Sequence, residues 1–272
     1  MPTRPTMHVL GCTRLPAALH AEWTKFRTVP GPSAALQAMV MSTIGLSAAA
    51  AAASTCGAPT CPQDPVRISL TGVSLGQALV VVFAVQLLGA EFGTGMIGTT
   101  LAAIPGRRTV MLAKATLLTA VVLATGIVAT VGSWLTGRIL LLGTGFIAEN
   151  GSALPGLSDG PTLRAVAGSA LYLVLVGLLS VGVAAAVRDS AVTIGTVLAV
   201  LYLFPVVITM VSNPDWHRFL QQIAPMNAGL AIQNTVDLGS APIGPWAGLG
   251  VLSCWAAAGL LLGGLLLGRR DV

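Results

Sequence analysis

The chain has 272 residues, of which 54% are hydrophobic and 8% are charged, and its formal net charge is +5. A soluble domain carries about 25% charged residues, so this composition excludes an ordinary water-soluble protein. The apolar residues gather in six stretches of roughly 20 residues, each long enough as a helix to cross a hydrocarbon core of about 30 Å. We therefore predict an all-α integral membrane protein with no separate ATPase, kinase or DNA-binding domain, and we expect no nucleic-acid partner.

The polar segment 1–33 comes first, and its second half predicts a helix that lies along the membrane surface. Between residues 18 and 27 the apolar side chains recur at helical spacing on one face: Leu19, Trp23 and Phe26. The charged side chains fall elsewhere: Glu22, Lys25 and Arg27. Aromatic rings at headgroup depth with cations facing water or lipid phosphate are typical of interfacial helices. Pro30-Gly31-Pro32 is expected to end this helix.

Residues 34–268 are predicted to form a transmembrane domain, followed by a short tail at 269–272. The expected spans are 34–54, 69–90, 110–135, 163–187, 191–211 and 246–268. Lys114 is close enough to the end of the third span for its amine to snorkel into the interface. Pairs of glycines four residues apart allow close helix approach and are candidate dimer contacts: Gly72 with Gly76, Gly259 with Gly263, and Gly264 with Gly268.

Cys56 and Cys61 fall in the short loop between the first two spans. A disulfide between them is chemically possible on an oxidising face, and two free thiols are an equally open alternative. Zinc needs further ligands, which this loop does not supply. Cys254, inside the last span, is interpreted as a small packing residue.

The segment between the second and third spans, 91–109, is too polar to continue a span and too short to form a domain. We predict a short surface helix that ends at Pro105-Gly106; the alternative is a plain linker held to anionic lipid by Arg107 and Arg108. Its glycines spell G-x-G-x-x-G from Gly93 to Gly98. No strand precedes them and no acidic residue follows at the required distance, so nucleotide binding is not predicted.

The segment 212–245, between the last two spans, is predicted to hold two short apolar helices separated by Ala224-Pro225. Such a segment can enter the outer leaflet if its backbone groups are paired within the protein. His217 is interpreted as an interfacial polar group rather than a catalyst or ligand.

The distribution of basic residues predicts the orientation. An even number of spans puts both termini on one side, and ten of the fourteen Lys and Arg residues share that side. The positive-inside rule then makes both termini cytoplasmic.

The predicted spans lack the chemistry of an enzyme or an ion-driven carrier. Their interiors contain no Asp, Glu or Arg, and their polar groups are Ser, Thr and Gln, such as Gln77 and Gln86. Because proton- or sodium-coupled carriers usually need an ionisable residue near the midplane, active transport would take its energy from a cytoplasmic partner.

These features together resemble the permease subunit of type 2 ABC exporters, in particular the small drug- or peptide-exporting permeases of high-GC Gram-positive bacteria. Two runs carry the resemblance: Glu22-Trp23-Thr24-Lys25-Phe26-Arg27, and the segment from Glu91 to Leu101 with Pro105, Arg107, Arg108 and Lys114. The final Arg269-Arg270-Asp271 also resembles the group. The chain departs from the family where it reads Gly93-Thr94-Gly95, since a basic residue often follows the Glu-Phe pair there.

The resemblance implies a role for each of these segments. It implies that 22–27 is an elbow helix on the cytoplasmic leaflet, that 91–104 is a coupling helix docked on a separate ATPase subunit, and that helices within 215–236 cap the outer exit. The coupling residues would be Glu91, Phe92, Thr94, Thr99, Thr100, Arg107 and Arg108. ATP and Mg would be bound by the ATPase, this chain would bind no cofactor and have no catalytic site, and two permeases would form the transporter.

The sequence therefore predicts a multi-pass subunit of a bacterial plasma-membrane exporter for drugs, peptides or lipid-like molecules, with a role in efflux and antibiotic resistance. One alternative is a non-transporting membrane module that anchors or regulates a partner protein. A secondary carrier driven by an ion gradient is a third.

Overall fold

The computed structural model describes residues 14–28, 30–54, 63–93, 107–143, 156–236, 238–239 and 241–269, and within these residues it contains helices and no strand. The helices are α1 (Arg14–Thr28), α2 (Pro30–Ala53), α3 (Pro65–Ser69), α4 (Val73–Gly93), α6 (Arg107–Gly143), α7 (Gly160–Val187), α8 (Ser190–Leu198), the π turn η1 (Ala199–Leu203), α9 (Phe204–Thr209), α10 (Pro214–Ile223), α11 (Pro225–Leu230), the 3₁₀ turn η2 (Ala231–Gln233) and α12 (Pro245–Arg269).

Five of the described helical segments are long and apolar enough to cross a membrane. They are Gly31–Ala53, Met111–Gly143, Gly160–Val187, Ser190–Thr209 and Pro245–Leu266. The remaining expected span, 69–90, overlaps α4, whose fully described apolar part, Val73–Leu88, is shorter. The all-helical membrane architecture is therefore confirmed, whereas the count of six spans stays a prediction.

Two predicted span boundaries differ from the observed helix ends. Ser69 ends the short helix α3, and α4 starts only at Val73 after a turn. The helix predicted at 110–135 runs for 37 residues as α6, a length of roughly 55 Å, well beyond one hydrocarbon core. The sequence did not reveal this extension because Arg138 stops the apolar pattern, yet its guanidinium lies 5.5 Å from the centre of the Trp134 ring, within the continuing helix.

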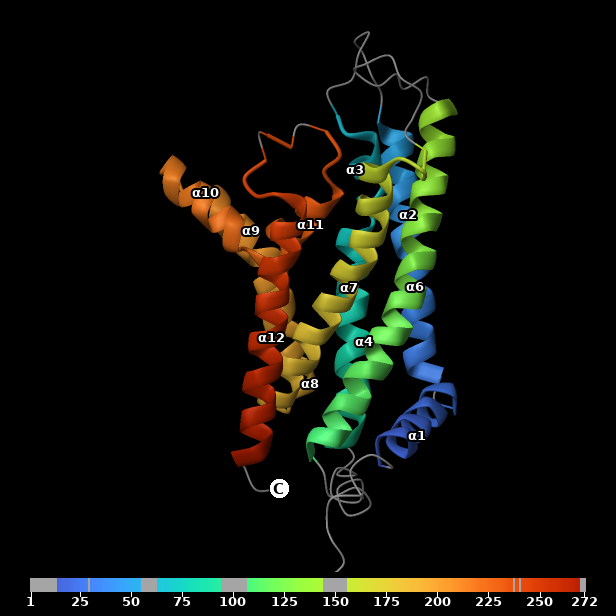
Figure 1. The fold of residues 1–272 in the computed structure, drawn as a ribbon, viewed down its shortest axis with the longest axis vertical. Coiled ribbons are helices and arrows are strands. Elements are labelled where there is room, and N and C mark those ends of the chain that lie inside the picture. Colours follow the sequence, from blue (N-terminus) through green and yellow to red (C-terminus); the bar gives the residue numbers. More distant parts are fainter. Residues whose placement is uncertain are drawn as a thin grey trace, which may run out of the picture.

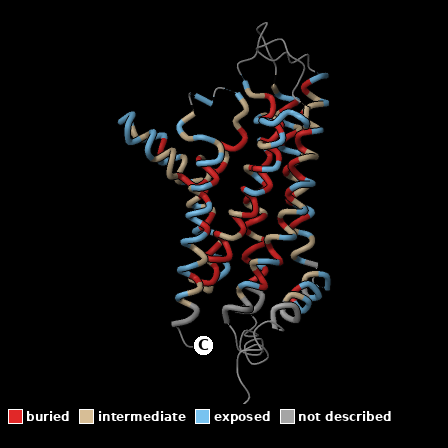
Figure 2. Tube along the Cα trace, viewed as in Figure 1, coloured by how far each residue is buried: buried red, intermediate tan, exposed pale blue. Residues whose placement is uncertain are grey.

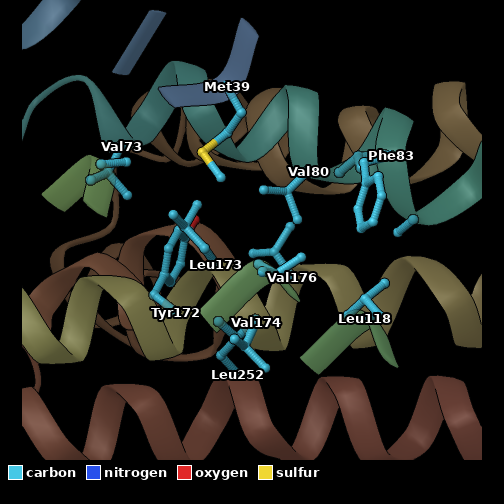
Figure 3. Close-up of a cluster of buried hydrophobic side chains, with 14 of the residues drawn as sticks. Met39, Val73, Val80, Phe83, Leu118, Tyr172, Leu173, Val174, Val176 and Leu252 are labelled. Carbon is cyan, nitrogen blue, oxygen red and sulfur yellow. The ribbon is translucent and has the colours of Figure 1, made fainter. Parts of the chain in front are cut away.

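The core of the bundle is built around α7, which contacts α4, α6 and α12 (Figure 1). In the most apolar part of α7, 67% of the residues are buried, whereas the corresponding share is 22% in Ser190–Thr209 and in Pro245–Leu266. Figure 2 shows the buried residues concentrated along the inner faces of the helices. Val80 of α4 lies close to Val176 of α7 in the core (Figure 3). The last two spans therefore leave most of their surface for lipid or for another protein.

Two of the three glycine pairs predicted as candidate dimer contacts, Gly72 with Gly76 and Gly259 with Gly263, pack inside the chain. A methyl group at Gly72 would lie 1.9 Å from the Thr43 carbonyl oxygen, so α2 packs directly on this glycine. A methyl group at Gly263 would lie 2.4 Å from the carbonyl oxygen of Gly182 on α7. Close backbone approach between small residues stabilises helix pairs in lipid. The dimer interpretation is corrected for these two pairs because their faces are already occupied within the bundle.

The helix Ser190–Thr209 changes its hydrogen-bonding pattern in the middle. The π turn η1 precedes Pro205, and the Phe204 amide donates to the Ala199 carbonyl, five residues back. Proline has no amide hydrogen and its ring crowds the preceding turn. A wider turn at this position accommodates Pro205 without ending the helix.

The two ends of the bundle carry different elements. The helix α1 and the C-terminal end of α12 lie at one end, and α3 and the start of α7 lie at the opposite end, in the upper part of Figure 1. Chain segments near both termini thus share one end.

Candidate functional site

Four of the seven predicted coupling residues lie at the ends of α4 and α6, on either side of the segment that joins these two helices. Glu91 and Phe92 are in the last turn of α4, and Arg107 and Arg108 begin α6. Both helix ends lie at the same end as α1 (Figure 1). Thr94, Thr99 and Thr100 are outside the described residues, as are Cys56 and Cys61 of the possible disulfide.

The helix expected at 18–27 belongs to α1, which is longer than predicted and runs obliquely to α2 (Figure 1). Trp23 is 43% exposed, Phe26 is half-buried and Arg27 is exposed. The Trp23 and Phe26 rings lie 5.7 Å apart, and Phe26 meets Phe83 of α4 edge to face at 6.2 Å. Lys25 lies on the same helix. The aromatic side of α1 is thus partly used to dock the helix on the bundle.

An ion pair between α1 and α6 is the central feature of this end of the molecule. The Lys114 amine lies 2.9 Å from Oε2 of Glu22 and donates a second hydrogen bond of 3.0 Å to the Leu87 carbonyl of α4. Glu22 is 5% exposed and Lys114 is 4% exposed. We call Glu22, Lys114 and the Leu87 carbonyl the α1 junction.

The α1 junction corrects one expectation. Lys114 does not snorkel to the interface, because α1 covers the end of α6 and brings the Glu22 carboxylate to the amine. Two charges buried together are tolerated when they pair and form further hydrogen bonds, whereas either one alone is costly. The pair therefore holds α1 at a defined position against α4 and α6.

The α1 junction lies close to the predicted coupling residues along the helices. Leu87 precedes Glu91 by one helical turn, and Lys114 follows Arg107 by about two turns. Continuous helix therefore joins the α1 junction to both ends of the segment between α4 and α6.

A second polar cluster lies inside the bundle. The Tyr172 hydroxyl of α7 donates to Oε1 of Gln77 on α4, and the Gln77 amide nitrogen donates to Sδ of Met226 on α11 at 3.4 Å. The Tyr202 hydroxyl, in the π turn, donates to the Ser74 carbonyl. The sequence analysis named Gln77 but not the tyrosines. They could have been noticed because both tyrosines of the chain fall in predicted spans, where a hydroxyl needs a hydrogen-bond partner.

Tyr172→Phe is expected to destabilise the protein by about 1–2 kcal/mol, because it leaves the buried Gln77 oxygen without its donor. Adding Gln77→Leu should recover part of the loss, since no orphaned acceptor then remains. Thermal unfolding in one detergent measures both effects. Thr196→Val, which removes an exposed hydroxyl bonded within its own helix, is the matched control. Equal unfolding temperatures for Tyr172→Phe and Thr196→Val would contradict the prediction.

The segment between α9 and α12 contains two short helices, α10 and α11, with the break at Ala224. His217 has both ring nitrogens engaged, Nδ1 with the Ile208 carbonyl at 3.0 Å and Nε2 with Gln221 at 2.9 Å. These contacts fit a structural polar group.

Within the described part of the chain, no group of three His, Cys, Asp or Glu residues could hold a metal ion. Cys254 is exposed on α12 rather than packed in the core, which corrects its interpretation as a packing residue.

The fold and its apolar helices define a multi-pass helical membrane protein. A scan against models of known protein families and a search of curated proteins each found no match for this chain.

Proposed function

We propose that this chain is the transmembrane permease subunit of an ATP-driven ABC exporter with six spans. In this proposal α1 is the elbow helix on the cytoplasmic leaflet of a bacterial plasma membrane, and both termini are cytoplasmic. The segment between α4 and α6 docks on a separate ATPase subunit, which binds ATP and Mg. A second permease completes the transporter, and the substrate is a hydrophobic drug, a peptide or a lipid-like molecule.

The single observation that carries the proposal is the α1 junction. A surface helix needs no buried ion pair to stay at a membrane, because its aromatic rings and cations suffice. Here Glu22 and Lys114 are buried together, and Lys114 also binds the last part of α4. The ion pair thus joins α1 to α4 and α6, the two helices on either side of the predicted docking segment. This connection supports a mechanical role for that segment.

The exposed apolar surface of the last two spans is compatible with a second transmembrane partner. Apolar residues of η1, α9 and α12 are exposed, including Leu203, Val206, Val207, Leu261 and Leu265. Lipid or a second permease would cover them. The low share of buried residues in these two spans fits either environment.

The test is co-purification and ATP turnover. The tagged chain is co-expressed with the ATPase subunits encoded in its own genome, and the complex is reconstituted into lipid vesicles. One ATPase is expected to co-purify. The double variant Glu91→Ala/Arg107→Ala should lower ATP turnover by about tenfold, because it alters both sides of the docking segment.

Arg67→Ala provides the matched control, since Arg67 is an exposed cation on α3 at the opposite end. It should leave ATP turnover unchanged. Failure of every ATPase to co-purify, or turnover that is the same in the double variant and the wild type, would contradict the proposal. A stable complex that moves no substrate with ATP would instead favour the membrane anchor or regulatory module.

A further inference from the structure

The segment 225–236, which we call the lid, covers part of the central helix α7 near the end that carries α3. It comprises α11, η2 and the residues Asn234 to Val236, and it packs on α7 and α12. Ala228, Gly229, Ile232 and Gln233 are all buried. Its inner surface is therefore fitted to the bundle.

Glycines on both sides form the seat of the lid. A methyl group at Gly168 of α7 would lie 2.1 Å from Cγ1 of Ile232, so the isoleucine fills the space that the glycine leaves. A methyl group at Gly229 would lie 2.5 Å from the Tyr172 ring. The close packing of Ile232 on Gly168 and of Gly229 on Tyr172 thus fixes the position of the lid on α7.

The lid also covers the interior polar cluster. Tyr172, which packs against Gly229, donates to Gln77, and Gln77 donates to the lid residue Met226. Movement of the lid away from α7 would remove a contact to each member of this pair. The position of the lid is therefore coupled to a hydrogen-bonded group in the centre of the bundle.

A single carboxylate joins the lid to the start of α3. Asp64 Oδ2 accepts from the Thr235 amide at 2.5 Å and from the Val236 amide at 3.2 Å, and Oδ1 accepts from the Thr235 hydroxyl at 2.8 Å. The same carboxylate caps α3 through the amides of Val66 and Arg67. One side chain therefore organises two segments about 170 residues apart in sequence.

The contacts of the lid with Asp64 are less buried than the contact that Gln233 makes. Thr235 is half-buried and Val236 is exposed, so water can solvate their amides when the carboxylate leaves. Gln233, by contrast, is buried and donates to Ser169 at 3.0 Å. The Arg164 guanidinium donates to the Asn234 carbonyl at 2.6 Å. Residues 234–236, which Asp64 and Arg164 hold, can therefore be released at lower cost than the part of the lid that Gln233 holds.

We propose that Asp64 is the latch of this lid and that releasing it lets the lid rise from α7 and uncover Tyr172 and Gln77. The lid is bounded by Pro225 on one side and on the other by non-helical chain that includes Gly239 and Gly244, where a methyl group would meet no atom within 4 Å. Chain of this kind can change its backbone angles with little steric resistance. This inference concerns the motion of the chain itself and requires no ATPase partner.

The test measures access to Ile232, a lid residue whose side chain is fully buried against α7. The four cysteines of the chain are replaced by serine, and Ile232→Cys is introduced. The purified protein in detergent is then treated with a water-soluble methanethiosulfonate reagent. Asp64→Ser is the informative variant, because serine still caps α3 but is too short to reach Thr235 and Val236. We expect it to raise the labelling rate by about tenfold or more.

Asp159→Ser is the matched control. Asp159 lies just before α7, and its carboxylate accepts from the nearby Gly156 amide at 2.6 Å rather than from the lid. It should leave the labelling rate within about twofold of the parent. Equal labelling in Asp64→Ser and Asp159→Ser would overturn the proposal.

Amide hydrogen exchange gives a second readout that needs no introduced cysteine. With the native Ile232 in place, Asp64→Ser should speed exchange in residues 228–236 and leave the centre of α7 protected. Unchanged exchange in the lid would overturn the proposal, as would equal acceleration over the whole chain. Neither readout depends on transport, so the lid and the exporter function can fail separately.

Discussion

Lys114→Met is expected to release α1 from the bundle and to destabilise its docked position by about 3–5 kcal/mol. The substitution keeps much of the side chain's volume but removes the Lys114 amine from the Glu22 carboxylate, which is 5% exposed in the native fold. Losing this amine makes burial of the carboxylate less favourable, so α1 should move until Glu22 reaches water. Amide hydrogen exchange across α1, with thermal unfolding on the same samples, measures the effect.

Removing both charges should cost less than removing one. In Glu22→Gln/Lys114→Met neither charge of the α1 junction remains, and we expect a substantial part of the lost stability to return. Arg27→Met is the control, since Arg27 is an exposed cation on the same helix. The interpretation of the α1 junction fails if the amides of α1 exchange at the same rate in Lys114→Met and in Arg27→Met.

Gly182→Ala is expected to separate α7 from α12 and to lower the free energy of unfolding by about 3 kcal/mol. The added methyl group would lie 2.3 Å from the Gly259 carbonyl carbon and 2.5 Å from the Leu260 nitrogen. Both are backbone atoms, so no side-chain rotation can relieve the overlap. Unfolding in detergent, followed by tryptophan fluorescence and size-exclusion chromatography, checks the prediction.

Gly250→Ala is the corresponding control on α12. A methyl group there would meet no atom within 4 Å, and alanine favours a helix over glycine by up to about 1 kcal/mol. Gly250→Ala should therefore be neutral or slightly stabilising. A Gly182→Ala protein as stable as Gly250→Ala would contradict the packing of α7 against α12.

The sequence predicted the helices well but the end of one of them poorly. Apolar stretches between polar segments predicted the correct location of α2, α7 and α12, because the part of a helix that crosses the hydrocarbon core must be mainly apolar. The extension of α6 past Arg138 was missed. Hydropathy marks where apolar side chains stop, whereas a helix continues as long as its backbone hydrogen bonds do.

The contacts between residues far apart in the chain could not be predicted from the sequence. Lys114 and Gln77 were noted as polar residues of the spans, but their partners Glu22 and Tyr172 lie 92 and 95 positions away. Asp64 was not singled out at all, because it follows a loop and carries no motif; only the arrival of Thr235 and Val236 at its carboxylate gives it a role.

The sequence by itself determined that this protein is helical and built for a membrane, since one-dimensional patterns of apolar and charged residues decide which segments can enter lipid. The tertiary structure alone decided which of its few charges are buried and which glycines are contact points. Burial of Glu22 with Lys114, and the meeting of Gly182 with Gly259, depend on how helices far apart in the chain come together. No local pattern encodes that arrangement, because it is the sum of many weak contacts across the whole bundle.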